Sequence, residues 1–184
     1  MSSELDAEGW LAGARRVPSP NCGARPAGQA VKLIVIHAIS LPPDEFGGGD
    51  IERLFTNCLD PAAHPYYLAI HALRVSAHFL IRREGDIEQF VPCGLRAWHA
   101  GVSSWRGTAC CNDFSIGIEL EGSDTSPFDT PQYAALARLI GILRKHYPVE
   151  AIVGHADIAP GRKTDPGPFF DWAHLDRLLA QNET

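Results

Sequence analysis

The chain has 184 residues, of which 45% are hydrophobic and 21% are charged, and its formal net charge is −6. This length suits one domain with a substantial core, and the composition is that of an ordinary globular protein. The negative charge argues against nucleic-acid binding, which needs a basic face, and no apolar stretch is long enough to span a bilayer. We therefore expect one domain that binds neither nucleic acid nor membrane, and we expect it to be a monomer.

The cysteines do not form the spacing of a disulfide framework. There are five of them, an odd number without a CxxC pair, and two are adjacent: Cys22, Cys58, Cys93, Cys110 and Cys111. This pattern favours a reducing compartment. The first ten residues also lack the basic start and apolar core of a signal peptide. The expected location is the cytoplasm.

The first part of the chain is predicted to be an irregular arm. Residues 1–30 are polar and contain several prolines and glycines, and we expect them to pack on a domain formed by residues 31–184. The apolar run 32–37 then predicts a buried strand that ends at His37.

A loop and a short helix are expected next. Residues 41–49 are rich in glycine and proline, which suits a mobile rim over a site, although the sequence does not show whether this loop moves. Asp50 is predicted to cap a short helix. Its buried face should contain Ile51, Leu54, Phe55, Cys58 and Leu59.

The remaining elements alternate between strands and helices. Residues 78–91 predict a hairpin with a glycine turn, and 114–121 alternate as a strand with Gly117, Glu119 and Glu121 on one face. Further elements follow in order: a helix that begins at Thr130–Pro131 and stops before Pro148, a strand over 151–155, and a last helix that begins near Asp171. The predicted class is α/β, a single domain with a mixed central sheet flanked by helices.

Three residues far apart in the sequence form a candidate metal-ligand set. His37 and His155 each close an apolar strand, and Asp165 lies in a stiff loop rich in glycine and proline. Two imidazoles and one carboxylate suit a catalytic zinc ion, which keeps its fourth position open. The alternative for each histidine is a buried structural role without any metal.

Two more residues are candidates for the chemistry. Glu119 projects from the polar face of its strand and is a candidate general base, although the same pattern fits a surface glutamate, and Glu121 shares its face. Lys163 lies two residues before Asp165, where its charge could stabilise an oxyanion. Its alternative is an ordinary solvated loop lysine.

Substrate-binding candidates come from two other segments. Trp98 and His99 stand beside small residues, where an indole could form the floor for a sugar or a peptide, and Arg74 could bind a carboxylate. The alternatives are a core tryptophan and a surface ion pair. His78 and His99 are the remaining histidines that we expect near the site.

These motifs together resemble one known family. The chain resembles the AmpD-type 1,6-anhydro-N-acetylmuramyl-L-alanine amidases of the zinc amidase_2 and peptidoglycan-recognition-protein superfamily. The likeness extends from residues 8–20 to 170–172. It is carried by His37 and by four segments, 73–78, 97–101, 112–122 and 154–167, of which the last is highly specific. Ordered motifs within one site are a stronger warrant than a shared fold.

The resemblance implies a complete catalytic site. It implies Zn²⁺ bound by His37, His155 and Asp165, with Glu119 as the general base and Lys163 as the oxyanion-stabilising group. The implied substrate is a small muropeptide, and the implied reaction hydrolyses the amide between the lactyl group of 1,6-anhydro-N-acetylmuramic acid and L-alanine. The implied role is cytoplasmic peptidoglycan recycling, which indirectly limits β-lactamase induction.

Two positions differ from the family pattern. Ala38 stands where asparagine is common, and Cys110 stands where arginine occurs, so the resemblance does not carry these two substrate contacts to this chain. The sequence also leaves open how strictly the anhydro ring is required and which stem-peptide residue is preferred at position three. Three alternatives remain: a binding module without activity, an amidase of polymeric cell wall, and an unrelated zinc peptidase.

Overall fold

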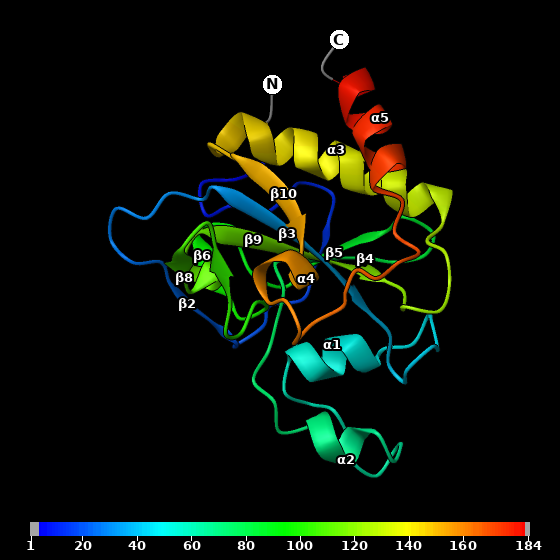
Figure 1. Ribbon diagram of the computed structural model, residues 1–184. Coiled ribbons are helices and arrows are strands. Elements are labelled where there is room, and N and C mark those ends of the chain that lie inside the picture. The colour runs from blue at the N-terminus through cyan, green and yellow to red at the C-terminus, as the bar shows by residue number, and fades with distance from the viewer. Residues whose placement is uncertain (1–3, 183–184) are drawn as a thin grey trace.

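A six-stranded mixed sheet forms the centre of the computed structural model, which describes residues 4–182 (Figure 1). The strand order is β1-β5-β4-β9-β3-β10. The strands are β1 (Arg15–Arg16), β3 (Leu33–Ile39), β4 (Phe79–Ile81), β5 (Ile87–Gln89), β9 (Ser115–Glu121) and β10 (Ala151–Gly154). Strands β4, β9, β3 and β10 run parallel, β5 is antiparallel to β4, and β1 is parallel to β5. This arrangement confirms the predicted mixed sheet and the predicted 78–91 hairpin.

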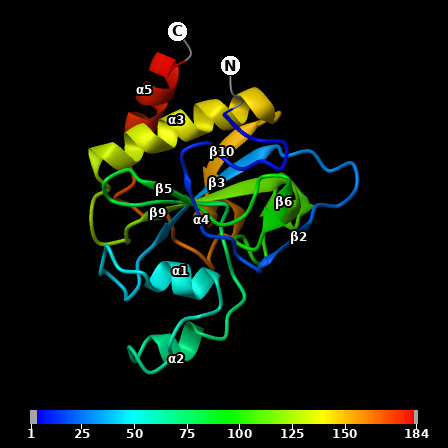
Figure 2. The same cartoon turned by 180° about the vertical axis from the view of Figure 1, so that it is seen from behind.

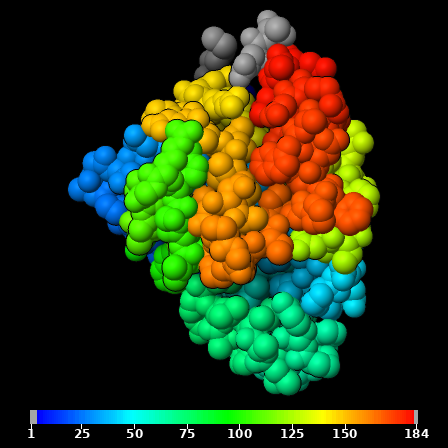
Figure 3. All heavy atoms as spheres, viewed as in Figure 1, coloured from blue at the N-terminus to red at the C-terminus, as the bar shows by residue number. Residues whose placement is uncertain are grey.

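Helices lie on both sides of the sheet, as the sequence predicts. Helices α3 (Thr130–His146) and α5 (Trp172–Asn182) lie on one side, and α1 (Asp50–Phe55) and α2 (Tyr67–Ile70) lie on the other (Figures 1 and 2). The short α4 (His155–Ile158) follows β10 directly. Smaller elements are β2 (Cys22–Ala24) paired with β6 (Leu95–Ala97), β7 (Ser104–Trp105) paired with β8 (Thr108–Ala109), and the 3₁₀ helix η1 (Cys111–Asp113). In the space-filling view the α2 segment protrudes at the end opposite α3 and α5 (Figure 3).

The main core lies between the sheet and α3 with α5. Alternate residues of the central strands, such as Ile34 and Ile116, pack against the buried face of α3. The apolar residues of that face recur at helical spacing. That face includes Leu136, Leu139, Ile140 and Leu143. Burial of each such side chain contributes about 1.5–3 kcal/mol before the loss of chain entropy.

Strand alternation sends the other residues of β3 to the opposite face. Leu33 and Val35 pack in a second cluster with Ile158 of α4. His37 continues this series, since side chains two apart on a strand share a face. The imidazole is therefore directed away from α3, toward the side of the sheet where α4 lies.

The predicted limits of α3 are confirmed. The helix begins after Asp129, whose backbone N–H donates to the Gln132 side chain at 3.0 Å, and Pro131 occupies its first turn. It ends at His146, before Pro148. Local sequence signals therefore determine both ends.

Two details predicted for the short helix α1 are wrong. The N-cap is Gly49, and Asp50 is the first helical residue; its carboxylate accepts from the Tyr67 hydroxyl at 2.7 Å instead of capping the helix. Cys58 is exposed and lies beyond the helix, because Asn57 adopts φ +62° and turns the chain. Ile51, Leu54, Phe55 and Leu59 are buried as expected.

The N-terminal arm and the strand predicted over 151–155 also show details that the sequence patterns did not indicate. Within residues 1–30, β1 joins the edge of the main sheet and β2 pairs with β6. His155 begins α4 rather than ending β10.

All five cysteine thiols are free. None of the helices in residues 4–182 combines the length and the apolarity that a membrane crossing requires.

Candidate metal centre and catalytic cleft

The candidate site lies at the carboxyl ends of three adjacent parallel strands. His37 of β3 is paired in register with Glu119 of β9, and Gly154 at the end of β10 is paired with Ile36. His155 follows Gly154 at once, so it reaches the same edge of the sheet. Carboxyl ends of parallel strands are where α/β proteins commonly place their ligands.

Asp165 completes a compact group of three donor atoms. The Nδ1 atoms of His37 and His155 are 3.0 Å apart, and the Oδ2 atom of Asp165 lies 3.1 Å from the first and 3.0 Å from the second. Three ligands at zinc distances of about 2.0–2.1 Å in tetrahedral geometry would be roughly 3.3 Å apart. The structure thus brings together all three residues of the predicted ligand set.

The hydrogen bonds around His155 test whether this group fits a cation. Its Nε2 lies 3.2 Å from the Ala100 carbonyl oxygen, which can only accept. The Nη2 of Arg162 is 3.4 Å from the same Nε2, but it donates its two hydrogens to Ala100 O and Val102 O at 2.7 and 2.8 Å. The Nε2 of His155 therefore carries the proton. The Nδ1 of a neutral ring is then an acceptor, and it faces an Asp165 oxygen that is also an acceptor. Two acceptors at 3.0 Å need a cation or a proton between them. Two imidazoles and a carboxylate are a donor set that zinc accepts.

Burial controls the charge state of the imidazoles. Desolvation is the main reason that the pKa of His37 falls to about 4, and it also places the pKa of His99 well below its ordinary value. Desolvation acts to raise the pKa of Asp165, but its close contacts with His155 and His37 outweigh desolvation and lower that pKa. At neutral pH His37 is therefore a neutral imidazole and Asp165 a carboxylate, which are the protonation states that metal ligands require.

Glu119 is a buried carboxylate without a complete set of partners. Its Oε2 atom has no hydrogen-bond partner among the described residues. Burial raises its pKa well above the ordinary value, the negative charge of Asp165 raises it further, and Lys163 opposes the shift. A carboxylate with a raised pKa is suited to accept and return a proton near neutral pH.

Lys163 lies in the loop that delivers Asp165. Its backbone N–H donates to Ala159 O at 3.1 Å, and Ala156 N–H donates to Asp165 O at 3.0 Å. The side chain is exposed and lines the cleft, and it has no salt-bridge partner within residues 4–182. Its charge is therefore available to a ligand in the cleft.

One cleft of about 550 Å³ contains all five proposed metal and catalytic residues. Trp98 and His99 also line it, as does Ala38, and Leu41, Pro43 and Asp44 of the predicted rim contribute to its edge. A second hollow, of about 600 Å³, lies between α3 and α5 and contains none of the predicted site residues. The chemistry-bearing side chains are thus gathered in a single place.

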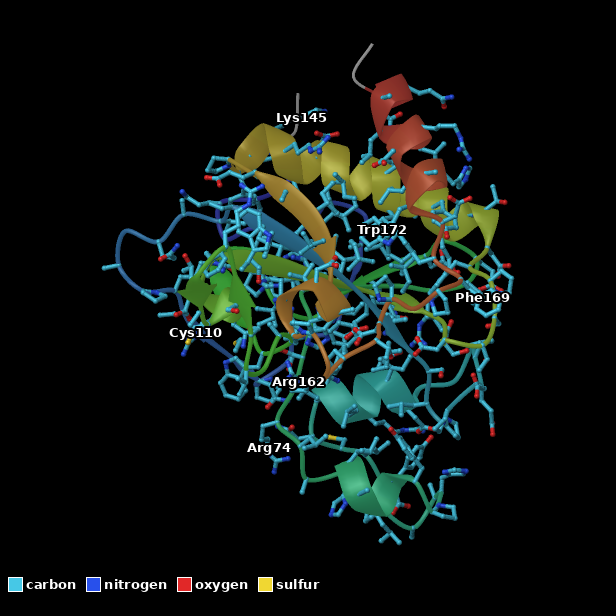
Figure 4. All side chains as sticks on the ribbon, viewed as in Figure 1. Arg74, Cys110, Lys145, Arg162, Phe169 and Trp172 are labelled. Carbon is cyan, nitrogen blue, oxygen red and sulfur yellow. The ribbon has the colours of Figure 1, made fainter. Side chains whose placement is uncertain are left out.

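Two residues considered in the sequence lie outside this lining. Arg74 is exposed on the segment that follows α2, and its Nη1 donates to Ala72 O at 3.3 Å (Figure 4). Its neighbours Leu73 and Val75 line the cleft, so Arg74 stands beside it. Cys110 is exposed near β8 and is not part of the cleft lining.

The sequence patterns did not single out Arg162, which also lines the cleft. Its Nη2 donates to the carbonyl oxygens of Ala100 and Val102 at 2.7 and 2.8 Å, which ties the loop of Asp165 to the segment after His99 (Figure 4). Its position next to Lys163 was the available signal.

A family model and a curated relative both show similarity to N-acetylmuramoyl-L-alanine amidases. The family model Amidase_2, described as N-acetylmuramoyl-L-alanine amidase, matches residues 27–168. The chain is 58% identical over 174 residues to the 1,6-anhydro-N-acetylmuramyl-L-alanine amidase AmpD of Citrobacter freundii, covering 94% of this chain and 93% of the relative.

Two solved structures extend the comparison. A crystal structure of a selenomethionine AmpD derivative superposes with a TM-score of 0.93 at 58% identity, covering 95% of this chain and 98% of that one. The amidase AmiD from Escherichia coli, in complex with anhydro-N-acetylmuramic acid-L-Ala-D-γ-Glu-L-Lys, gives a TM-score of 0.59 at 30% identity, covering 95% and 65%.

Proposed function

This chain belongs to the Amidase_2 family of N-acetylmuramoyl-L-alanine amidases, and on that premise we propose that it hydrolyses 1,6-anhydro-muropeptides. The bond cleaved is the amide between the lactyl group of 1,6-anhydro-N-acetylmuramic acid and the L-alanine of the stem peptide. The observation that carries this proposal is the convergence of His37, His155 and Asp165 beside Glu119 and Lys163 in one cleft.

The proposed cofactor is Zn²⁺, held by His37, His155 and Asp165. Their mutually facing acceptor atoms support this choice. Bound zinc supplies a Lewis acid that polarises a carbonyl and makes water nucleophilic at neutral pH.

The proposed role of Glu119 is proton transfer. Its raised pKa and unpartnered oxygen suit it to take a proton from the attacking water and to deliver that proton to the leaving nitrogen of L-alanine. Lys163 would place its positive charge near the amide oxygen, where negative charge develops as the carbonyl becomes tetrahedral. Both roles need only groups that already line the cleft.

The proposed substrate contacts come from the cleft wall and its margin. Trp98 offers an aromatic face to the sugar or the peptide, and His99 contributes to the same wall. Arg74, whose neighbours Leu73 and Val75 line the cleft, would bind a carboxylate of the stem peptide. The complex of AmiD with an anhydro-muramyl tripeptide supports a small muropeptide as the ligand class.

The proposed setting is peptidoglycan recycling in the cytoplasm, with an indirect lowering of β-lactamase induction through removal of muropeptides. Five free thiols support a reducing compartment. We further infer that residues 31–184 form the amidase domain, that residues 1–30 pack on it as an arm, and that the protein acts as a monomer.

A matched substrate panel tests the proposal. The protein is incubated with zinc and with 1,6-anhydro-muramyl tripeptide, the corresponding reducing muramyl tripeptide, or the free tripeptide, and products are identified by mass spectrometry. We expect release of intact tripeptide, faster from the anhydro sugar, and no cleavage of the sugar-free peptide. Cleavage within the free tripeptide would indicate a peptidase, and metal binding without any cleavage would indicate a binding module. The Glu119→Gln variant controls for contaminating amidases.

A further inference from the structure

A chain of hydrogen bonds leads from His37 back to a backbone carbonyl of η1, the 3₁₀ helix before β9. We infer that His99 and Ser115 are positioning residues that fix the tautomer of His37, so that its Nδ1 lone pair faces the proposed metal position. This inference deepens the proposed function and rests on it. The links are Cys111 O to Ser115 Oγ, Ser115 Oγ to His99 Nε2, and His99 Nδ1 to His37 Nε2.

The direction of the chain is decided at Ser115. Its Oγ lies 2.6 Å from Cys111 O, and a carbonyl oxygen can only accept. Two oxygens this close repel each other unless a hydrogen lies between them, so the hydroxyl hydrogen of Ser115 points at Cys111. Ser115 can then offer only a lone pair to His99.

His99 passes this constraint to His37. The 3.1 Å contact between His99 Nε2 and Ser115 Oγ requires Nε2–H as the donor, and the Nδ1 of a neutral ring is then an acceptor. His37 Nε2 lies 2.8 Å from that acceptor and must donate to it. His37 Nδ1 is left unprotonated, 3.1 Å from Asp165 Oδ2 and 3.0 Å from His155 Nδ1.

If the hydrogen bonds ran in the opposite direction, His37 would be protonated at Nδ1, and that atom could not bind a metal. Ser115 would then donate to His99 Nε2, which would leave its oxygen 2.6 Å from Cys111 O with no hydrogen between the two. The closeness of these two oxygens therefore selects the metal-ready tautomer.

The ring of His99 sits in a place built for it. Ser115, Gly117 and Glu119 share one face of β9, and a Cβ added at Gly117 would lie 2.4 Å from His99 Cγ. Only glycine leaves room for the ring at this point of the strand. The backbone N–H groups of His99 and Ala100 both donate to Asn112 Oδ1, at 3.1 and 2.8 Å. Backbone, ring and polar atoms of His99 are thus all held.

A matched pair of variants separates the loss of the hydrogen-bond acceptor of His99 from the loss of its packing. His99→Asn keeps an acceptor close to the Nδ1 position, and His99→Leu has a similar shape without it. Zinc affinity is measured by competition with a chromophoric chelator, and apo-protein stability is measured in parallel. We expect His99→Leu to lose roughly 10–100-fold in zinc affinity, as for other partners of metal-ligating histidines, and His99→Asn to retain most of it. Ser115→Ala should fall between them.

The tautomers are also measured directly in the metal-free protein. Side-chain ¹⁵N shifts should show His37 and His99 protonated at Nε2. His37 protonated at Nδ1, or an unchanged zinc affinity in His99→Leu, would overturn this inference while leaving the proposed function standing. A wild-type protein that binds no zinc would refute the proposed function instead.

Discussion

His37 and Glu119 occupy paired positions on the adjacent parallel strands β3 and β9. A proposed metal ligand and the proposed general base are therefore neighbours by sheet register, on two strands of which β9 is buried throughout and β3 is buried from Leu33 to His37. Neighbouring strands are about 4.8 Å apart, so small shifts of a loop cannot separate these two side chains. Groups placed on rigid elements keep the fixed geometry that catalysis requires.

Loss of the Asp165 carboxylate should abolish metal binding. Asp165→Ala removes the only anionic member of the donor set, and we expect both zinc content and activity to be lost. Asp176→Ala on α5, far from the cleft, is the matched control and should behave as wild type. Zinc content after dialysis, measured by atomic spectroscopy, checks this; full metal retention in Asp165→Ala would disprove the ligand assignment.

Glu119→Gln should separate chemistry from metal binding. The amide is nearly isosteric with the carboxylate but cannot accept the proton, so we expect activity to fall by about 10²–10⁴-fold with zinc retained. Burial already disfavours the charge of Glu119, so the free energy of unfolding should not decrease. Steady-state kinetics and chemical denaturation measure the two effects, with the surface variant Glu150→Gln as control. Activity close to that of wild type would remove Glu119 from the mechanism.

Lys163→Ala should lower kcat while zinc stays bound. Removal of one oxyanion-stabilising group commonly costs about 10²–10³-fold in kcat. Lys145→Ala, on the exposed surface of α3, removes the same charge at a distance and should leave kcat unchanged (Figure 4). If Lys163→Ala changed KM alone, the residue would be a binding group for the substrate.

Buried His78 should make the fold sensitive to acid. Burial, followed by the charge of Arg25, lowers its pKa from 6.5 to about 3. Between these values the unfolded chain binds a proton that the folded chain does not, so stability is lost as pH falls from 6.5 toward 3. The contribution to the slope is about 1.4 kcal/mol per pH unit for one proton.

The variant His78→Asn isolates this contribution. It removes the titrating group but keeps an acceptor for the Gly117 N–H, which now donates to His78 Nδ1 at 3.0 Å. Urea unfolding at several pH values should give a shallower slope for His78→Asn than for wild type. The same substitution at exposed His146 should leave the slope unchanged. Parallel slopes for wild type and His78→Asn would show that His78 titrates normally in the folded protein.

The sequence patterns predicted much of the fold because its main elements carry strong local signals. Buried strands such as 33–39 are continuous apolar runs, and α3 has helical periodicity together with a proline start and a proline stop. Elements of two or three residues, such as β7 and β8, are too short to show a period. Asp50 was misassigned because a carboxylate that can cap a helix can also accept from a distant hydroxyl, here that of Tyr67.

For the candidate site too, local patterns predicted some features and long-range contacts determine the others. Strand alternation predicts which face Glu119 occupies, but not that β9 would lie beside β3 and bring it next to His37. The approach of Asp165 to both histidines depends on the loop after α4, which Arg162 fastens to the carbonyl oxygens of Ala100 and Val102. The resemblance to a family supplied those long-range relations; periodicity and spacing alone did not.

Zinc reconstitution of the apo-protein tests the central claim most directly. Metal is removed with a chelator, zinc is added back in steps, and release of tripeptide from 1,6-anhydro-muramyl tripeptide is followed at each step. The account predicts no activity in the apo-protein and a rise that saturates at one zinc ion per chain. Activity in the metal-free protein, or saturation with zinc and no hydrolysis, would contradict it.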